Sequence, residues 1–251
     1  MEMLRISERD IRRHAPSTAL SACWRQWRAE RRLARGGVHF RGTDCQAIAD
    51  AYAAMSDQDF DAINARQDWA NWRTIPRAMS THVPDRPLRV IDLGCGAGSS
   101  TRVLAFYCPA GSRITGYELV PALLDVACRR AYRHRDGRPA DVAFVCQPVT
   151  DELRARDGGR LPDGSVDLAK ASGIVGHHLS AQSVQPLIGE LRRVILPDGI
   201  AMLDVGPELP ADVLTPLLAG HGFTHLGSKK SWFLDPTAQL IFCRQSTTGT
   251  A

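Results

Sequence analysis

Apolar residues follow a helical period through the first eighty positions of the chain. Ile48, Tyr52 and Met55, for example, recur at i, i+4 and i+7. Residues at this spacing lie on one face of an α-helix. The pattern predicts an N-terminal helical segment over residues 1–80, built from three or four helices.

The pattern changes at residues 81–87, where two prolines favour extended backbone. From there, short apolar runs alternate with longer helical patterns. The runs predict strands at Leu88–Leu93, Ile114–Glu118, Val142–Cys146, Val166–Ala171, Ile200–Val205, Phe223–Lys229 and Ala238–Arg244. The patterns between them predict helices at Ser99–Tyr107, Pro121–Arg133, Leu179–Ile195 and Ala211–Ala219.

Alternating strands and helices are typical of βαβ units, which form a parallel sheet covered on both faces. The last two predicted strands have no helical pattern between them, so they can pair antiparallel. We therefore expect an α/β fold, namely a seven-stranded, mostly parallel, doubly wound sheet with an antiparallel C-terminal hairpin. This domain would span residues 81–251, with residues 1–80 as a cap or lid.

The composition fits a folded globular protein, since 44% of the 251 residues are hydrophobic and 23% are charged. No run approaches the roughly 18 apolar residues that a membrane helix needs, and the N-terminus lacks the apolar centre of a secretory signal. The seven cysteines form no C-x2-C pair, which gives no support for a zinc or iron–sulfur site. We therefore expect a cytoplasmic protein without a metal or a membrane partner.

Positive charge is concentrated near the N-terminus. Residues 1–43 contain ten arginines and four acidic residues, whereas the rest of the chain has a formal charge of −2. Five arginines fall on one face of a predicted helix, with two tryptophans beside them: Arg25, Arg28, Arg31, Arg32, Arg35, Trp24 and Trp27. Such a stripe is more often a solvated face than a phosphate-binding surface. The charge distribution alone therefore does not favour a nucleic-acid partner.

A glycine-rich segment follows the first predicted strand. It reads Asp92-Leu93-Gly94-Cys95-Gly96-Ala97-Gly98 and leads into a predicted helix. Glycine lets the backbone approach a ligand closely, and the helix N-terminus presents free N–H groups to that ligand. A dinucleotide-binding loop would have glycine in place of Ser99, and the Asp92 carboxylate would repel a pyrophosphate. The same carboxylate suits a ligand that carries an ammonium group.

At these residues the chain resembles the class I S-adenosylmethionine-dependent methyltransferases, whose first motif reads E/D-x-G-x-G-x-G. The resemblance continues through Leu161–Leu168, Gly173–Leu179 and Glu190–Gly199 and covers about residues 88–244. It is strongest to the branch that acts on small metabolites. The resemblance implies a Rossmann-like domain, S-adenosyl-L-methionine as the cofactor, and methyl transfer to a small-molecule acceptor by in-line displacement.

The resemblance also implies which residues hold the cofactor. Glu118 takes the place of the family's ribose-binding acid, since a carboxylate can accept from both ribose hydroxyls. The family's acid for the adenine amino group has no equivalent here, because Pro148 lies near its place, so Gln147, Asp151 or backbone groups would serve instead. The implied cofactor-binding residues are Asp92, Gly94, Cys95, Gly96, Ala97, Gly98, Glu118, Leu119, Gln147, Pro148, Val149, Ser172 and Gly173.

Methyl transfer needs aligned reactants and sometimes a base that removes a proton. His177 and His178 are the candidate catalytic residues, because the resemblance places the loop after the fourth strand beside the methyl group, and imidazole exchanges protons near neutral pH. Their alternative role is to pack against the following helix or cap it. Trp69 and Trp72 either wall the acceptor pocket or dock their helix on the sheet.

Other functions are compatible with the same features. The alternatives are a methyltransferase that acts on RNA or on protein, and a catalytically silent cofactor-binding module that partners another protein. A nicotinamide enzyme is disfavoured by Ser99 and Asp92. The sequence fixes neither the acceptor atom nor the oligomeric state.

Overall fold

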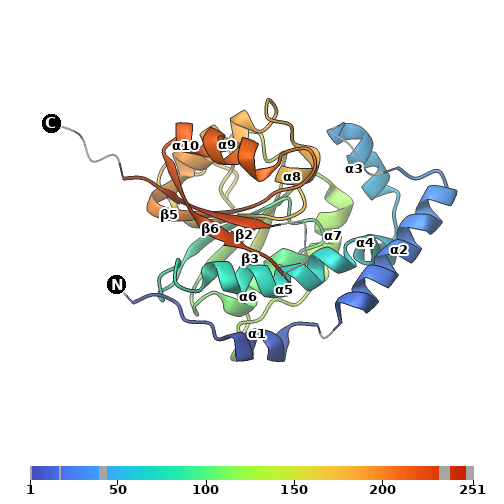
Figure 1. Ribbon diagram of the computed structural model, residues 1–251, viewed down its shortest axis with the longest axis horizontal. Helices are drawn as coiled ribbons and strands as arrows, with labels where there is room; N and C mark the ends of the chain where they lie inside the picture. Colours follow the sequence, from blue (N-terminus) through green and yellow to red (C-terminus); the bar gives the residue numbers. More distant parts are fainter. Residues whose placement is uncertain (1, 17, 40–43, 232–237, 247–251) are drawn as a thin grey trace.

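The computed structural model describes residues 2–16, 18–39, 44–231 and 238–246. A seven-stranded sheet lies at its centre, with strand order β3-β2-β1-β4-β5-β7-β6 (Figure 1). The strands are β1 Arg89–Leu93, β2 Arg113–Glu118, β3 Asp141–Cys146, β4 Val166–Ala171, β5 Ile195–Asp204, β6 Phe223–Lys229 and β7 Gln239–Arg244. Strands β1 to β5 pair in parallel, and β7 pairs antiparallel with both β5 and β6. The expected α/β fold with its C-terminal hairpin is confirmed.

Strand order reverses in the middle of this sheet. The chain builds outward from β1 to β3 and then returns to place β4 on the other side of β1. The register pairs Asp92 of β1 with Lys170 of β4, and Leu93 with Ala171. Ligands of open α/β sheets bind beyond the carboxyl ends of the strands at such a point, and the glycine-rich loop leaves β1 there.

The helices after β1 differ most from the expected ones around α8 and α9. They are α6 Ser99–Tyr107, α7 Pro121–Arg129, α8 Val175–His178, α9 Gln185–Val194 and α10 Ala211–Gly220. The helix predicted at Leu179–Ile195 begins only at Gln185, because a turn lies between His178 and Gln185, and the short helix α8 lies before the predicted range. In that turn the N–H of Ser180 donates to the hydroxyl of Ser183 and the N–H of Ser183 donates to the hydroxyl of Ser180. Pro186 then occupies the first turn of α9, where a missing N–H costs nothing.

The start of one strand and the end of one helix also lie more than one residue from their expected positions. Strand β5 begins at Ile195, five residues before the predicted start, because Ile195 pairs with Val166 of β4. Helix α7 ends at Arg129, whereas the pattern predicted a helix as far as Arg133. The end of the helical pattern therefore locates these boundaries only approximately.

Five helices precede the sheet in the described part of the chain, more than the three or four predicted. They are α1 Glu8–His14, α2 Ala19–Arg35, α3 Cys45–Ala53, α4 Asp57–Ile63 and α5 Ala65–Met79. Separate N-caps divide the helical pattern. The carboxylate of Asp44 accepts from the N–H groups that open α3, and the hydroxyl of Ser56 does the same for α4. Helices α2, α3 and α4 lie together to one side of the sheet (Figure 1).

Helix α5 is the element that joins these helices to the sheet. Its buried face packs Trp72, Ile75 and Met79 into a core shared with α6, β1 and β5. The Trp72 ring meets Phe106 edge-on at 5.5 Å between centroids, and Trp69 is buried in a separate cluster with Ala22 of α2. Of the two roles considered for these tryptophans, docking on the sheet is the one that the structure shows for Trp72, whereas Trp69 packs α5 against α2. Loss of a buried aromatic ring of this kind costs about 3–5 kcal/mol.

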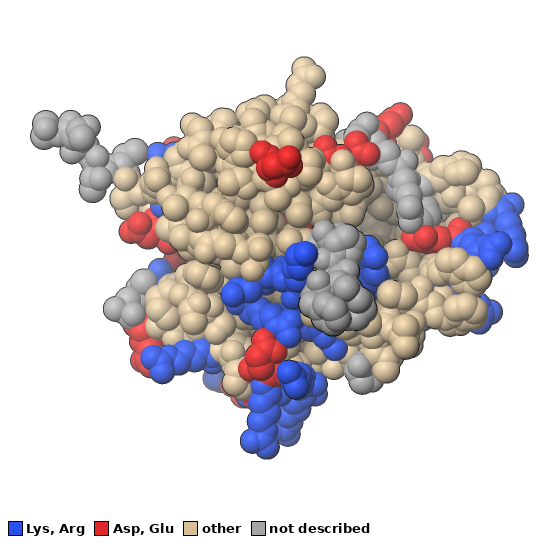
Figure 2. Space-filling model, in the orientation of Figure 1, with Lys and Arg blue, Asp and Glu red and all other residues tan. Residues whose placement is uncertain are grey.

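The surface carries the positive charge that the sequence placed near the N-terminus. Figure 2 shows Lys and Arg side chains gathered on one face over the region of α1 and α5, where Arg77 pairs with Glu8 at 2.7 Å. The five arginines of α2 are exposed, and Trp24 beside them is 58% exposed. Within the described residues, no helix combines the length and the apolar character that crossing a membrane requires.

Candidate active site

The glycine-rich loop has a backbone that only glycine adopts readily. Gly94, Gly96 and Gly98 have φ values of 64°, 53° and 82°. A Cβ added at Gly94 would lie 2.9 Å from the Ile174 side chain, and one at Gly96 would lie 3.0 Å from the Phe60 ring. The loop is therefore bordered by α4 on one side and by the segment after β4 on the other, and it has no room for side chains.

Asp92 lies beneath this loop and is fully buried. Its Oδ2 accepts hydrogen bonds from the hydroxyls of Ser100 at 2.7 Å and Thr101 at 2.6 Å. Burial raises the pKa of Asp92, while Lys170 and the two hydroxyls oppose that shift. The carboxylate thus fastens the first turn of α6 to the end of β1, a role that the sequence did not indicate. Its contact with a cofactor stays a prediction.

Glu118 ends β2 and reaches the glycine-rich loop, as its place in the sequence suggested. Its Oε2 accepts from the N–H of Gly96 at 3.0 Å, and its Oε1 accepts from the N–H of Val120 at 2.9 Å. Burial raises the pKa of Glu118, and these backbone hydrogen bonds counter the rise. The carboxylate is therefore held in one orientation beside the loop. Leu119, the next residue, is 37% exposed.

The segment after β3 uses the side chain of Gln147 internally. Its amide nitrogen donates to the carbonyl of Glu152 at 3.2 Å, and its Oε1 accepts from the N–H of Arg154 at 3.0 Å. Val149 is buried as well. Gln147 thus shapes the loop that would border an adenine ring, and a direct side-chain contact with adenine stays a prediction.

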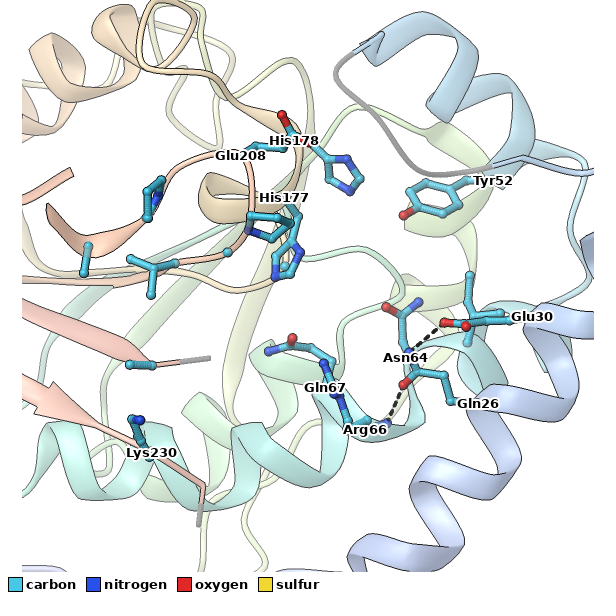
Figure 3. A pocket seen from close by; sticks show the side chains of 18 residues that line it. Gln26, Glu30, Tyr52, Asn64, Arg66, Gln67, His177, His178, Glu208 and Lys230 are labelled. Atoms are coloured by element: carbon cyan, nitrogen blue, oxygen red, sulfur yellow. Dashed lines mark hydrogen bonds between the residues drawn. The ribbon is translucent and has the colours of Figure 1, made fainter. Parts of the chain in front are cut away.

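A cavity of about 840 Å³ opens between the N-terminal helices and the sheet. Figure 3 shows residues of α2, α3 and α5 on one side of it and the two histidines of α8 on the other. Gly173, one of the predicted cofactor residues, lies in its wall. The polar residues that line it include Gln26, Glu30, Tyr52, Asn64, Arg66, Gln67, His177, His178, Glu208 and Lys230.

Both predicted catalytic residues therefore reach the cavity. Nε2 of His177 lies 3.7 Å from Oδ2 of Asp204, and the same Oδ2 accepts from the N–H of Gly173 at 2.9 Å. His178 faces Tyr52 edge-on, with 6.4 Å between the ring centroids. The chemistry available here is proton removal by an imidazole with a carboxylate behind it.

Sequence reasoning missed several residues of this site. Tyr52 belongs to the apolar face that predicts a helix, and Glu208 lies in a loop that carries no motif. Asp204 had a usable signal, because an acid at the carboxyl end of a buried strand points toward the ligand edge of the sheet. Trp69 and Trp72, which the sequence allowed as walls of the acceptor pocket, lie in packed core clusters. Gln67 is the residue of the same helix that lines the cavity.

Lys170 is a second residue whose importance the sequence did not show. It lies inside β4 with no exposed surface, and its ammonium group donates to the carbonyl of Ala171 at 2.7 Å and to the hydroxyl of Ser172. Burial lowers the pKa of Lys170 to about 8, although the carboxylates of Asp92 and Asp204 favour the charged form. A charged residue inside an apolar strand was the available signal.

Comparison with known proteins identifies part of the chain. Residues 90–199 match a family model described as a methyltransferase domain. No curated protein matches the chain in sequence. The matched residues contain the glycine-rich loop, Glu118 and both histidines of α8.

Solved structures share the fold. A chain in the complex between the Haloferax volcanii Trm112 methyltransferase activator and a protein classed as a methyltransferase aligns with a TM-score of 0.57 and 16% identity, over 79% of this chain and 98% of that one. Magnesium protoporphyrin IX methyltransferase from Synechocystis PCC 6803, solved with bound SAM, aligns with a TM-score of 0.51 and 15% identity, over 91% and 92%. An arsenic (III) S-adenosylmethionine methyltransferase from Chlamydomonas reinhardtii aligns with a TM-score of 0.48 and 19% identity, over 64% of each chain. This chain therefore spans less than two thirds of that enzyme's length. At these identities the likeness concerns the fold.

Proposed function

We propose that this protein transfers a methyl group from S-adenosylmethionine to a small molecule held in the cavity, because residues 90–199 match a methyltransferase-domain model and the sheet around them has the fold of solved methyltransferases. When bound, the cofactor supplies a methyl group that leaves its sulfur as the acceptor atom attacks. The chain's own residues must then align the acceptor, keep water out and take up any proton that the acceptor loses.

The residues at the carboxyl end of β1 fit this cofactor. Gly94, Gly96 and Gly98 have positive φ and no Cβ, so the backbone of this loop can approach a ligand closely. Glu118 is held beside Gly96 and has lone pairs left to accept from ribose hydroxyls. Phe60 borders the same loop and would form part of the site's wall.

The cavity supports the choice of His177 as the base. Asp204 is held by the N–H of Gly173, so its carboxylate is fixed behind the imidazole. A proton taken from an acceptor hydroxyl or ammonium group would place positive charge on His177, next to that carboxylate. His178 lies beside Tyr52 at the other edge of the cavity and would contact the acceptor rather than take its proton.

The shape of the site supports a small acceptor over RNA or protein. The observation that carries the proposal is a cavity of about 840 Å³, within the range of small-ligand sites, with both histidines in its wall. The exposed arginines Arg28 and Arg31 lie on the outer face of α2, whereas Gln26 and Glu30 on its inner face line the cavity. The basic stripe is thus separate from the proposed acceptor site.

Tritium transfer tests this proposal. Protein, methyl-labelled cofactor and fractions of a cell extract sorted by size and polarity would be incubated together. We expect label in a low-mass fraction, a loss on the order of 100-fold for His177→Ala, and no loss for His225→Ala, whose exposed side chain lies on β6 outside the cavity. Label in RNA or protein would overturn the small-molecule acceptor, and calorimetry without cofactor binding would overturn the methyltransferase function.

A further inference from the structure

Four polar side chains form a hydrogen-bonded chain from the sheet to the cavity; we refer to Lys170, Ser172, Asn71 and Gln67 as the Lys170 chain. The ammonium group of Lys170 donates to the hydroxyl of Ser172. That hydroxyl donates to Oδ1 of Asn71 at 2.8 Å. The amide nitrogen of Gln67 donates to the same Oδ1 at 3.1 Å. Lys170 and Asn71 are buried, and Gln67 lines the cavity.

The charge on Lys170 sets the direction of every bond in this chain. An ammonium group can only donate, so the Ser172 oxygen accepts from it and the single hydroxyl proton is free to donate elsewhere. That proton requires an acceptor, which fixes the carbonyl oxygen of Asn71 toward Ser172. Each orientation therefore follows from the one before it.

The last member of the chain faces the proposed reaction site. Because Gln67 must offer its N–H to Asn71, its carbonyl Oε1 is the atom that is turned away from the chain. This Oε1 would lie 4.0 Å from a Cβ placed on Gly173, whose own N–H bonds Asp204 behind His177. The cavity thus presents a hydrogen-bond acceptor, not a donor, close to the candidate base.

Two carboxylates near Lys170 favour its charged form. Asp92 lies on β1 directly across from it in the register, and Asp204 ends the neighbouring β5. In the described part of the chain, Oδ1 of each of these two carboxylates is buried without a hydrogen-bond partner. The two carboxylates favour the charged form of Lys170 against the opposing effect of burial, and the charged form is the one that orients the chain.

We infer that Gln67 selects acceptors that carry an O–H or N–H group at the reacting atom, and that the Lys170 chain fixes this preference. The inference rests on the function proposed above and names the acceptor class for that same site. An O–H or N–H would donate to Oε1 of Gln67 before its proton passes to His177. An acceptor atom without hydrogen, such as the sulfur of a thioether, would leave Oε1 unpaired, and an unpaired polar group weakens binding.

Binding of two matched probes tests this inference without a known acceptor. Phenol and anisole have the same ring, and only phenol has an O–H. Ligand-observed NMR would give their dissociation constants with the full-length protein in the presence of S-adenosylhomocysteine. We expect the wild-type protein to favour phenol by about threefold to tenfold, the gain of one hydrogen bond, and Gln67→Leu to lose the preference.

A second set of variants tests the chain behind Gln67. Lys170→Met removes the charge that sets the bond directions, and Ser172→Ala breaks the chain without removing a charge, so it remains informative where Lys170→Met does not fold. Both are expected to reduce the preference for phenol. Gln26→Leu is the matched control, because the Oε1 of this cavity glutamine already accepts from the N–H of Arg66, so the preference should persist.

The outcomes separate this inference from the proposed function. A phenol preference that persists in Gln67→Leu overturns the role of Gln67. A phenol preference that persists in Ser172→Ala, and in Lys170→Met if that variant folds, overturns the role of the Lys170 chain. Failure of the protein to bind S-adenosylmethionine in calorimetry would instead count against the methyltransferase function, whatever the probe ratio shows.

Discussion

Nε2 of His177 lies 3.7 Å from Oδ2 of Asp204, the residue that ends β5. The Asp204 carboxylate is held by the N–H of Gly173 and has only 10% of its side chain exposed. It is therefore a fixed negative charge behind the imidazole. A group in that place would stabilise the imidazolium that forms if His177 acts as the proposed base.

Asp204→Asn tests this pairing. We expect kcat to fall on the order of 100-fold, because the amide cannot stabilise the imidazolium as the carboxylate does. The amide oxygen can still accept from the N–H of Gly173, so the dissociation constant of the cofactor and the free energy of unfolding should stay near wild type. Steady-state kinetics measures kcat, and calorimetry measures the cofactor dissociation constant and the unfolding. An unchanged kcat would remove Asp204 from the mechanism.

Glu118→Gln tests the ribose-binding role proposed for this acid. Charged hydrogen-bond acceptors are stronger than neutral ones, so we expect the cofactor dissociation constant to rise by about 10-fold to 100-fold. Glu152→Gln is the control, because Glu152 is an exposed acid of the same kind outside the site. Calorimetry with S-adenosylmethionine gives both values, and equal affinity in the two variants would contradict the assignment.

Lys170 should make stability depend on pH in the alkaline range. Burial lowers its pKa to about 8 in the folded protein, below the value of 10.5 that the unfolded chain has. The unfolded protein therefore binds more protons between these values, and the free energy of unfolding rises with pH through that window. Relative to Lys170→Met, the wild type should gain about 2 kcal/mol between pH 7.5 and pH 10.

Urea unfolding of both proteins at several pH values measures this difference. Other groups that titrate in the same window contribute to both proteins, so subtraction isolates Lys170. Removal of Lys170 also leaves Asp92 and Asp204 without their cation, and we expect Lys170→Met to be less stable than the wild type at pH 7.5. A difference between the two proteins that stays constant with pH would show that Lys170 is not buried in solution.

Two tryptophans test how α5 is docked. Trp72 is buried against Phe106 and Tyr107, whereas Trp24 on α2 is 58% exposed. Trp72→Ala should lower the free energy of unfolding by about 3–5 kcal/mol, and Trp24→Ala should change it by less than about 0.5 kcal/mol. Urea unfolding followed by circular dichroism compares them. Similar values for both variants would mean that α5 does not pack on α6.

The sequence predicted the features that depend on neighbouring positions in the chain. Short apolar runs located all seven strands, and the spacing of Gly94, Gly96 and Gly98 after a strand located the loop of the proposed cofactor site. Ends of elements were less certain, because capping side chains decide them. The helix predicted over Leu179–Ile195 begins only at Gln185, because Ser180 and Ser183 form a hydrogen-bonded turn before it.

Features that depend on pairing between distant positions did not follow from the sequence. Lys170 faces Asp92 only because β4 pairs with β1 in one register. Tyr52, Glu30 and Glu208 line one cavity because helices from the first part of the chain fold against loops from the last part. Tyr52, Glu30 and Glu208 have ordinary local patterns, so no local rule separates them from packing or surface residues, and the charge of Lys170 inside an apolar strand does not identify its partners.

The division of the cavity between the two parts of the chain has a consequence for how acceptor choice would change over evolutionary time. Glu30, Tyr52 and Gln67 all come from helices that precede β1, whereas Gly94–Gly98 follow β1 and Glu118 ends β2. Grafting a foreign N-terminal segment onto the same sheet would therefore replace one side of the recognition surface and spare the glycine loop. Such a chimera would inherit its methyl donor from one parent and much of its substrate range from the other.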